Sequence, residues 1–174
     1  MLLAFLLLAL QAPADPALFD AATGYRTARY RAVVPAPPEG VTRIGVDEVR
    51  ALHAKGAPLI DVTPAEGAIR DPASGHWRLA MPHDSLPGAH WFPEAGRGVP
   101  AAGIESWFVM GVARVTHGSK ARPLVVFCLA DCWMSWNAAL RLHRAGYVDV
   151  RWFADGIDGW KEAGLPVKRV VPAR

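Results

Sequence analysis

The sequence predicts an α/β fold of three layers, in which helices flank a central, mostly parallel sheet. Short apolar runs typical of buried strands, at residues 58–62 and 124–127, alternate with segments of helical periodicity. Strands and helices that alternate in this way form parallel sheets with helices on both faces. With 174 residues, 52% of them hydrophobic, the chain is long enough for one domain with a full core.

The first 14 residues contain no charged side chain and end in Ala12-Pro13-Ala14, which suits cleavage before Asp15. Their apolar run is shorter than the roughly 20 residues that span a bilayer. We therefore expect a signal peptide over 1–14, export to the periplasm, and no stable membrane span after cleavage. A buried N-terminal helix is the alternative interpretation.

Residues 15–41 contain four prolines around Tyr25 and Tyr30, which predicts an N-terminal arm packed on the domain by its aromatic side chains. The domain itself is expected over 42–170. It begins with a short helix over 47–56 that ends at a glycine, followed by the buried strand over 58–62.

The stretch 63–100 is rich in Pro, Gly and His, and predicts a long loop without regular elements. Apolar residues then recur at helical spacing over 104–115, which predicts a helix ending at Gly118. The remaining elements expected are the strand over 124–127, a helix over 134–144 and a strand over 148–153.

Both cysteines of the chain lie in one loop, Cys128-Leu-Ala-Asp-Cys132-Trp133, between the apolar strand 124–127 and the following helix. Backbone N–H groups at a helix start, together with the helix dipole, favour a thiolate over a thiol. Carboxyl ends of strands are also where open α/β sheets place their ligand crevice. Thiol chemistry at Cys128 is one interpretation, and an inert buried cysteine or a structural disulfide is the other.

Composition and spacing exclude several other classes of site. The net charge is only +3 and no run of five basic residues occurs, so the sequence shows neither a nucleic-acid footprint nor a polybasic membrane patch. Two thiolates without a nearby His pair leave a tetrahedral zinc site half empty. Trp133 follows Cys132 where covalent haem attachment needs His. We expect no metal and no cofactor.

Three separated motifs resemble those of a rhodanese-like domain. They are Pro58-Leu-Ile-Asp-Val62, Leu86-Pro-Gly-Ala-His90, and the Cys loop with the helix, strand and Ala154–Val167 segment that follow it. They cover roughly residues 42–168. The resemblance implies a rhodanese-like three-layer domain in which Cys128 takes a sulfane sulfur as a persulfide and passes it to an acceptor.

A closer resemblance is to bacterial proteins associated with pyrroloquinoline-quinone-dependent catabolism that carry a Cys-Xaa-Xaa-Cys-Trp motif. It rests on Phe19–Arg26 with Tyr30, on Cys128–Asn137 and on Asp155–Trp160. Here three residues, not two, separate the cysteines. The resemblance implies a periplasmic protein that works beside quinoprotein alcohol oxidation.

Cys132 offers a second step, because it can resolve a persulfide or mixed disulfide on Cys128 and leave a disulfide within the loop. The other positions expected at this site comprise a loop and pocket set and a candidate pocket wall. The loop and pocket set is Leu129, Ala130, Asp131, Trp133, Met134 and Ser135, and the wall is Asp61 and His90, with His83 beside them.

Charge in the loop argues against small anionic sulfur donors. Rhodanese loops commonly carry an Arg, whereas here no Arg or Lys lies between Cys128 and Asn137 and the only charge is Asp131. An acidic group near the sulfur raises the pKa of the thiol and repels anions. The apolar rim expected from Trp133, Met134 and Trp136 suits the docking of a protein or an aromatic cofactor.

Two functions stay open on the sequence. The first is a periplasmic sulfurtransferase or thiol-redox enzyme that uses Cys128 and exchanges sulfur with a donor, an acceptor or a thiol partner. The alternative is a non-catalytic accessory module that binds a quinoprotein dehydrogenase or its cytochrome partner.

Overall fold

The computed structural model describes residues 15–174, so the expected signal peptide lies outside the described residues. A five-stranded sheet forms the middle layer, with the strand order β1-β8-β7-β2-β6 and every neighbouring pair parallel. The strands are β1 (Thr42–Ile44), β2 (Leu59–Asp61), β6 (His90–Trp91), β7 (Leu124–Phe127) and β8 (Val150–Phe153). The predicted parallel sheet flanked by helices is confirmed.

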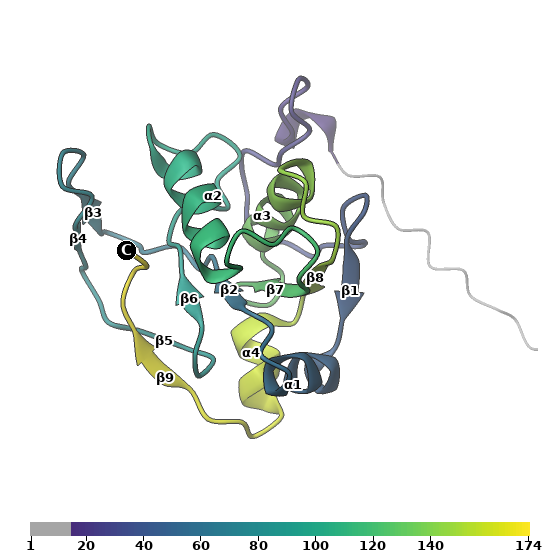
Figure 1. Cartoon of the computed structure of the whole chain (residues 1–174). Helices are drawn as coiled ribbons and strands as arrows, with labels where there is room; N and C mark the ends of the chain where they lie inside the picture. Colours follow the sequence, from purple (N-terminus) through teal and green to yellow (C-terminus); the bar gives the residue numbers. More distant parts are fainter. Residues whose placement is uncertain (1–14) are drawn as a thin grey trace, which may run out of the picture.

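Two pairs of helices cover the two faces of the sheet (Figure 1). Helices α2 (Ile104–Val115) and α3 (Trp133–Arg144) pack on one face, and α1 (Val46–Ala54) and α4 (Gly156–Glu162) on the other. Alternate side chains of β7 divide between the layers: Val126 faces α2 and α3, whereas Val125 and Phe127 face α1 and α4. A strand buried on both faces needs apolar side chains throughout, which is why 124–127 is a continuous apolar run.

The helix predicted over 104–115 occurs at those bounds, and the strand predicted over 124–127 likewise. The helix expected from residue 134 begins one residue earlier, directly after Cys132. Helix α1 ends at Ala54, and Gly56 follows with a φ of +81°, a conformation that a glycine adopts without strain. The strand expected from residue 148 begins only at Val150.

The prediction that 63–100 lacks regular elements is wrong. Strands β3 (Ile69–Arg70) and β4 (Trp77–Arg78) form a short antiparallel hairpin, and β5 (His83–Ser85) pairs with the C-terminal strand β9 (Lys168–Val170). Strands of two or three residues are too short to show a period of two in the sequence. The partner of β5 also lies about 85 residues away in the chain, where no local pattern points to it.

The N-terminal arm begins with a 3-10 turn, η1 (Pro16–Leu18), and runs along the α3 side of the domain (Figure 1). Buried Asn137 on α3 holds it: its side-chain oxygen accepts from Arg26 N at 2.9 Å, and its amide donates to Arg26 O at 2.8 Å. The same amide donates to Gly96 O at 2.9 Å. One side chain therefore joins the arm to the loop after β6. Within residues 15–174, no helix has both the length and the apolarity to cross a membrane.

Candidate active site: the cysteine loop

Cys128 directly follows β7, and Cys132 is the residue before the first turn of α3, so the loop lies at the carboxyl edge of the sheet. The two sulfur atoms lie at disulfide-bonding distance, with the Cα atoms 6.6 Å apart. Cys128 is 0% exposed and Cys132 is 3% exposed. The loop therefore holds a sealed pair of sulfurs rather than an open thiol.

The turn of the loop depends on Asp131, which has a φ of +50° although it is not a glycine. Asp is among the residues that tolerate this left-handed conformation. In the first turn of α3, Ser135 Oγ donates to Cys132 O at 3.1 Å and accepts from the Trp152 indole N–H at 3.0 Å. This buried chain of bonds fixes Cys132 against the sheet.

The expected ring of N–H groups around the Cys128 sulfur is only partly available. Ala130 N donates to the Asp158 carboxylate at 2.9 Å, and Trp133 N donates to Tyr30 O at 2.8 Å. The polar atoms that the Cys128 sulfur does contact are carbonyl oxygens, of Leu129 at 3.6 Å and of Cys132 at 3.9 Å. Two of the donors expected to favour a thiolate are thus occupied by other partners.

The N-terminal arm closes the loop from outside. Arg31 pairs with Cys132 as an isolated antiparallel bridge, with Ala32 N donating to Asp131 O at 2.8 Å on one side. The bond from Trp133 N to Tyr30 O lies on the other side. Sequence reasoning placed Tyr30 in the arm but missed this pairing, because nothing in the local pattern of either segment specifies the other.

The apolar rim expected around the loop is covered as well. Trp133 is 4% exposed, with the Phe19 ring at 5.3 Å and the Arg26 guanidinium at 4.6 Å from its ring centre. Trp136 is half-buried and donates its indole N–H to Ala36 O at 3.0 Å. These tryptophans bind the protein's own arm, and so they do not form an open docking rim in this structure.

Helix α4 closes the loop from the opposite side. Ile157 N donates to Cys128 O at 2.8 Å, and a side chain on Gly156 would collide with that same carbonyl. The φ of Gly156 is +56°, so this position requires glycine on both counts. Asp158, which the sequence analysis did not single out, supplies the carboxylate at the loop N–H. The repeated Asp-Gly spacing of 155–159 is the signal that could have identified it.

The predicted site residues do not all meet at the loop. Of the loop and pocket set, Leu129 and Ala130 are half-buried and Asp131 is exposed. Trp133, Met134 and Ser135 are buried in the first turn of α3.

The candidate pocket wall lies away from the Cys loop. Asp61 belongs to the sheet face that α1 and α4 cover, where its carboxylate accepts from Thr63 N and Ser85 Oγ and pairs with His83 Nε2 at 2.7 Å. His90 is the first residue of β6 and lines a small cavity of about 210 Å³ with His53 at the amino edge of the sheet. Asp61 therefore lies on the opposite face of the sheet from Cys128, and His90 lies at the opposite edge of the sheet.

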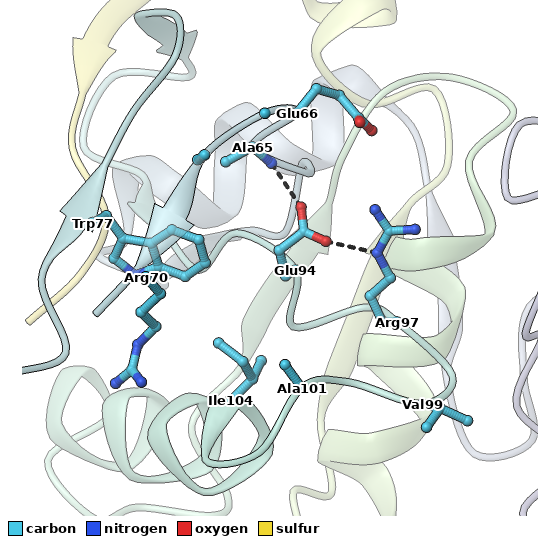
Figure 2. Close-up of a pocket in the computed structure, with 11 residues that line it drawn as sticks. Ala65, Glu66, Arg70, Trp77, Glu94, Arg97, Val99, Ala101 and Ile104 are labelled. Carbon is cyan, nitrogen blue, oxygen red and sulfur yellow. Dashed lines mark hydrogen bonds and ion pairs between the residues drawn. The ribbon is translucent and has the colours of Figure 1, made fainter. Parts of the chain in front are cut away.

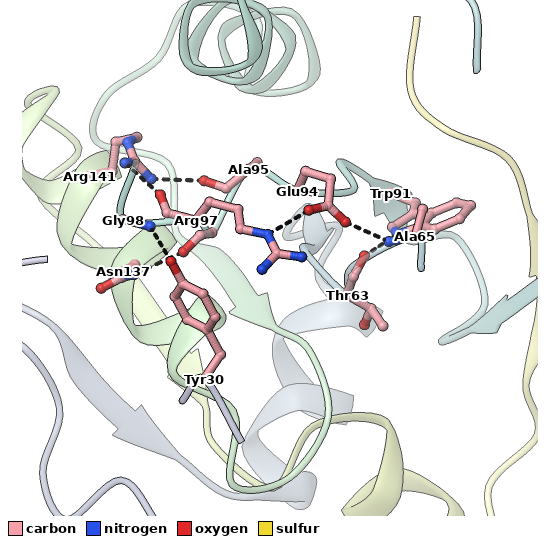
Figure 3. Close-up of polar contacts among 11 residues, drawn as sticks. Tyr30, Thr63, Ala65, Trp91, Glu94, Ala95, Arg97, Gly98, Asn137 and Arg141 are labelled. Carbon is pink, nitrogen blue, oxygen red and sulfur yellow. Dashed lines mark hydrogen bonds and ion pairs between the residues drawn. The ribbon is translucent and has the colours of Figure 1, made fainter. Parts of the chain in front are cut away.

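The arm also reaches the loop that follows β6. The Tyr30 hydroxyl accepts from Gly98 N at 3.0 Å, and the Arg97 guanidinium lies 5.2 Å from the centre of the Tyr30 ring (Figure 3). Within residues 15–174, no cluster of three or more His, Cys, Asp or Glu side chains is arranged to hold a metal ion. The chemistry available in the loop itself is that of its two sulfurs.

No protein-family model and no curated protein matches the chain. Among solved structures, it is similar to a thiosulfate sulfurtransferase from Pseudomonas aeruginosa at 19% identity and a TM-score of 0.50, over 77% of this chain and 21% of that one. It is also similar to an EanB variant in complex with hercynine, at 17% identity and a TM-score of 0.50, over 75% of this chain and 32% of that one. The chain thus spans between a fifth and a third of the length of these relatives. The likeness shows a rhodanese-like α/β fold.

Proposed function

We propose that the protein is a sulfurtransferase or thiol-redox enzyme in which Cys128 accepts sulfur and Cys132 resolves it. One observation carries the proposal: the two sulfurs lie at bonding distance in a loop between a central strand and a helix. The rhodanese-like fold and its sulfurtransferase neighbour support this assignment. A lone thiol at the strand end would support sulfur transfer only, whereas the pair also supports a disulfide-forming step.

The proposed reaction has two steps that balance. The Cys128 thiolate attacks the sulfane sulfur of a donor, the donor leaves with the electron pair of the broken bond, and a persulfide forms on Cys128. The Cys132 thiolate then attacks the Cys128 sulfur, so that the Cys128–Cys132 disulfide forms and hydrosulfide leaves. A dithiol reductant, oxidised to its own disulfide, restores both thiols. Passing the outer sulfur directly to an acceptor nucleophile is the sulfurtransferase branch of the same intermediate.

The donor proposed is uncharged or a polysulfide chain, rather than thiosulfate. Asp131 is exposed at the tip of the loop, and the Asp158 carboxylate already occupies Ala130 N. Two carboxylates near the sulfur, with no basic residue between Cys128 and Asn137, repel thiosulfate, whose two negative charges lie close to the transferred sulfur. A polysulfide chain spreads its charge along its length and can keep its far end outside the loop.

The arm has to move for the reaction to occur, because Cys128 has no exposed surface. Two backbone hydrogen bonds join the arm directly to the loop: Ala32 N to Asp131 O, and Trp133 N to Tyr30 O. Local opening that breaks two backbone hydrogen bonds requires much less free energy than global unfolding. We propose that a donor protein or a transient opening exposes the pair.

We further propose that the protein works in the periplasm, beside a quinoprotein alcohol dehydrogenase. The motifs that resemble those of quinoprotein-associated proteins support the association, and the apolar, uncharged segment 1–14 supports export. Because the periplasm favours disulfides, a pair that forms a disulfide in each turnover would depend there on a dedicated dithiol reductant. Recovery of the chain from a periplasmic extract, beginning at Asp15, is the test of the location.

A second candidate function has one observation in its favour. The arm, α3 and α4 bury both sulfurs, as they would in a structural disulfide. The chain would then be a non-catalytic module that binds a quinoprotein dehydrogenase or its cytochrome partner. Its cysteines would stay oxidised, and replacing both would change the thermal stability but not the binding.

The deciding experiment starts from fully reduced protein incubated with inorganic polysulfide. We expect hydrosulfide to appear in the solution while the protein loses about 2 Da, the two hydrogens given up in disulfide formation. Reduction with dithiothreitol, removal of the excess reductant and a second addition of polysulfide should repeat the release. Protein that cannot be reduced without unfolding, or that releases no hydrosulfide, would favour the non-catalytic module.

A further inference from the structure

A cavity of about 440 Å³ lies outside the Cys loop, between the β3–β4 hairpin and the start of α2 (Figure 2). Its walls come from the segments that follow β2 and β6, so it opens at the carboxyl edge of the sheet, where α/β proteins place ligands. Its size falls within the range of small-molecule sites. The residues that line it include Ala65, Ala68, Trp77, Glu94, Arg97 and Ile104.

Arg97 supplies a fixed positive charge at one end of this cavity. Its Nε donates to Glu94 Oε2 at 2.6 Å, and the other Glu94 oxygen accepts from Ala65 N at 2.9 Å (Figure 2). Glu94 holds this position with a φ of +64°. Within the part of the chain that the structure describes, neither terminal nitrogen of Arg97 has a hydrogen-bond partner. Glu94 thus uses both oxygens to orient the guanidinium and leaves its outer donors free.

Two donors on the hairpin beside the cavity have no acceptor in the described part of the chain, but neither atom has accessible surface. Arg70 Nε and Trp77 Nε1 are buried and have no hydrogen-bond partner among residues 15–174. Both atoms can only donate. Glu66 is an acceptor at the rim, but it is exposed and therefore hydrated. Free donors reach the cavity from the terminal nitrogens of Arg97, whose side chain is 33% exposed, and they suit a ligand that brings negative oxygens.

The rest of the wall is apolar. The Trp77 ring, which lies 6.0 Å from the Trp107 ring, forms one side, and Ile104 and Ala101 lie across the cavity from Ala65 (Figure 2). An inorganic anion would leave this surface in contact with water. A flat apolar body attached to the anionic group would cover it.

We propose that this cavity binds a small organic carboxylate with a flat apolar body, held by Arg97 at one end and by Trp77 along its side. This site is distinct from the Cys loop and does not depend on the sulfur chemistry proposed for it. Tyr30 connects the two regions, because its ring contacts Arg97 and its carbonyl accepts from Trp133 N.

Isothermal titration of the oxidised protein with phenylacetate tests the proposal, with phenylacetamide and sulfate as comparison ligands. We expect phenylacetate to bind at least about tenfold more tightly than either, because only it has both the charge and the ring. Arg97→Gln should weaken phenylacetate binding about tenfold, and Trp77→Ala should weaken it by a similar factor. Arg78→Gln, on the same hairpin and outside the cavity wall, should leave binding within about twofold.

Other outcomes would overturn the proposal. If phenylacetate and phenylacetamide bound with equal affinity, Arg97 would not recognise the carboxylate. If sulfate bound as tightly as phenylacetate, the apolar wall would not contribute to binding. Absence of phenylacetate binding to the unaltered protein would remove the site. Near-ultraviolet circular dichroism identifies variants that misfold. If Arg97→Gln misfolds, Trp77→Ala and the ligand comparison still decide the outcome.

Discussion

The Cys loop and the cavity beside the β3–β4 hairpin lie at the same edge of the sheet, yet one is sealed and the other is open. The loop has the residues with reactive chemistry, and the arm, α3 and α4 cover it until Cys128 has no exposed surface. The cavity has no nucleophile, and its free guanidinium donors face a space of about 440 Å³. The reactive cysteines and the accessible cavity therefore lie in different segments, and Tyr30 of the arm contacts both.

The closed state depends most strongly on Asn137, so Asn137→Ala should have the largest effect. The substitution leaves Arg26 N, Arg26 O and Gly96 O without their buried partner. We expect a loss of about 3 kcal/mol in the free energy of unfolding, because unsatisfied buried groups cost on the order of 1 to 3 kcal/mol each. Urea denaturation measures it, with Glu48→Ala, an exposed position on α1, as the control. A loss no greater than that of the control would mean that the arm is held by its aromatic contacts instead.

Gly156→Ala should have the next largest effect, since it removes the close approach of α4 to the loop. The added methyl group meets the Cys128 carbonyl, and the φ of +56° is unfavourable for alanine. We expect a destabilisation of about 2 kcal/mol or more, the range of strained and overpacked sites. Gly164→Ala is the matched control, because Gly164 has a φ of +72° with open space around it. Gly164→Ala should lower the free energy of unfolding by about 1 kcal/mol, the cost of the backbone strain alone. Equal losses of stability in Gly156→Ala and Gly164→Ala would mean that α4 moves away from the loop at little cost in free energy.

Loosening the arm locally should make the Cys loop accessible to reagents in solution. Ala32→Pro removes the N–H that donates to Asp131 O and so loosens the bridge between Arg31 and Cys132. In reduced protein we expect the alkylation rate of the loop thiols to rise about tenfold, because exposure then requires a smaller local opening. Iodoacetamide labelling followed by mass spectrometry measures the rate. Arg31→Ala keeps the backbone bonds and should leave the rate unchanged. A rate that Ala32→Pro does not alter would show that the thiols are reached by another route.

Whether the sequence predicts a contact depends on how far apart its two partners lie in the chain. The helix over 104–115 and the strand over 124–127 follow from local periodicity, and the Cys loop between strand and helix follows from them. The bond from Asn137 to Arg26 and the pairing of Arg31 with Cys132 join segments about 100 residues apart. No local pattern encodes such partners, so the seal over Cys128 was not predictable.

The open cavity was missed for a related reason. Except for Ile104, its wall comes from 65–101, which has the composition of an irregular loop. The hairpin strands in it have only two residues each. Glu94 and Arg97 look like ordinary surface charges in the sequence. Only the backbone conformation at Glu94 brings its carboxylate to both Ala65 N and the Arg97 guanidinium.

The smallest effect expected concerns the β5–β9 ribbon, which lies apart from both regions. A hydrogen bond from Arg169 to Asp84, at 2.6 Å, lowers the pKa of Asp84. The folded-state pKa then lies below the unfolded value of about 3.9, so the pair stabilises the fold above that pH and ceases to do so as the pH falls through the folded-state pKa. Asp84→Asn should lower the melting temperature slightly at pH 7 and by less at pH 3. Glu39→Gln, at an exposed position of the arm, is the control. An Asp84→Asn effect that grows towards acid would contradict the sign.

The most direct test of the account is the mass of two single-cysteine variants after reduction and incubation with inorganic polysulfide. Cys128→Ser should gain no sulfur and release no hydrosulfide, since the accepting thiol is absent. Cys132→Ser should gain about 32 Da, one sulfur atom, and keep it longer than the unaltered protein, because its resolving thiol is absent. A stable sulfur adduct on Cys128→Ser, with none on Cys132→Ser, would contradict this assignment and reverse the two roles. Absence of an adduct on both variants would refute sulfur transfer by this loop.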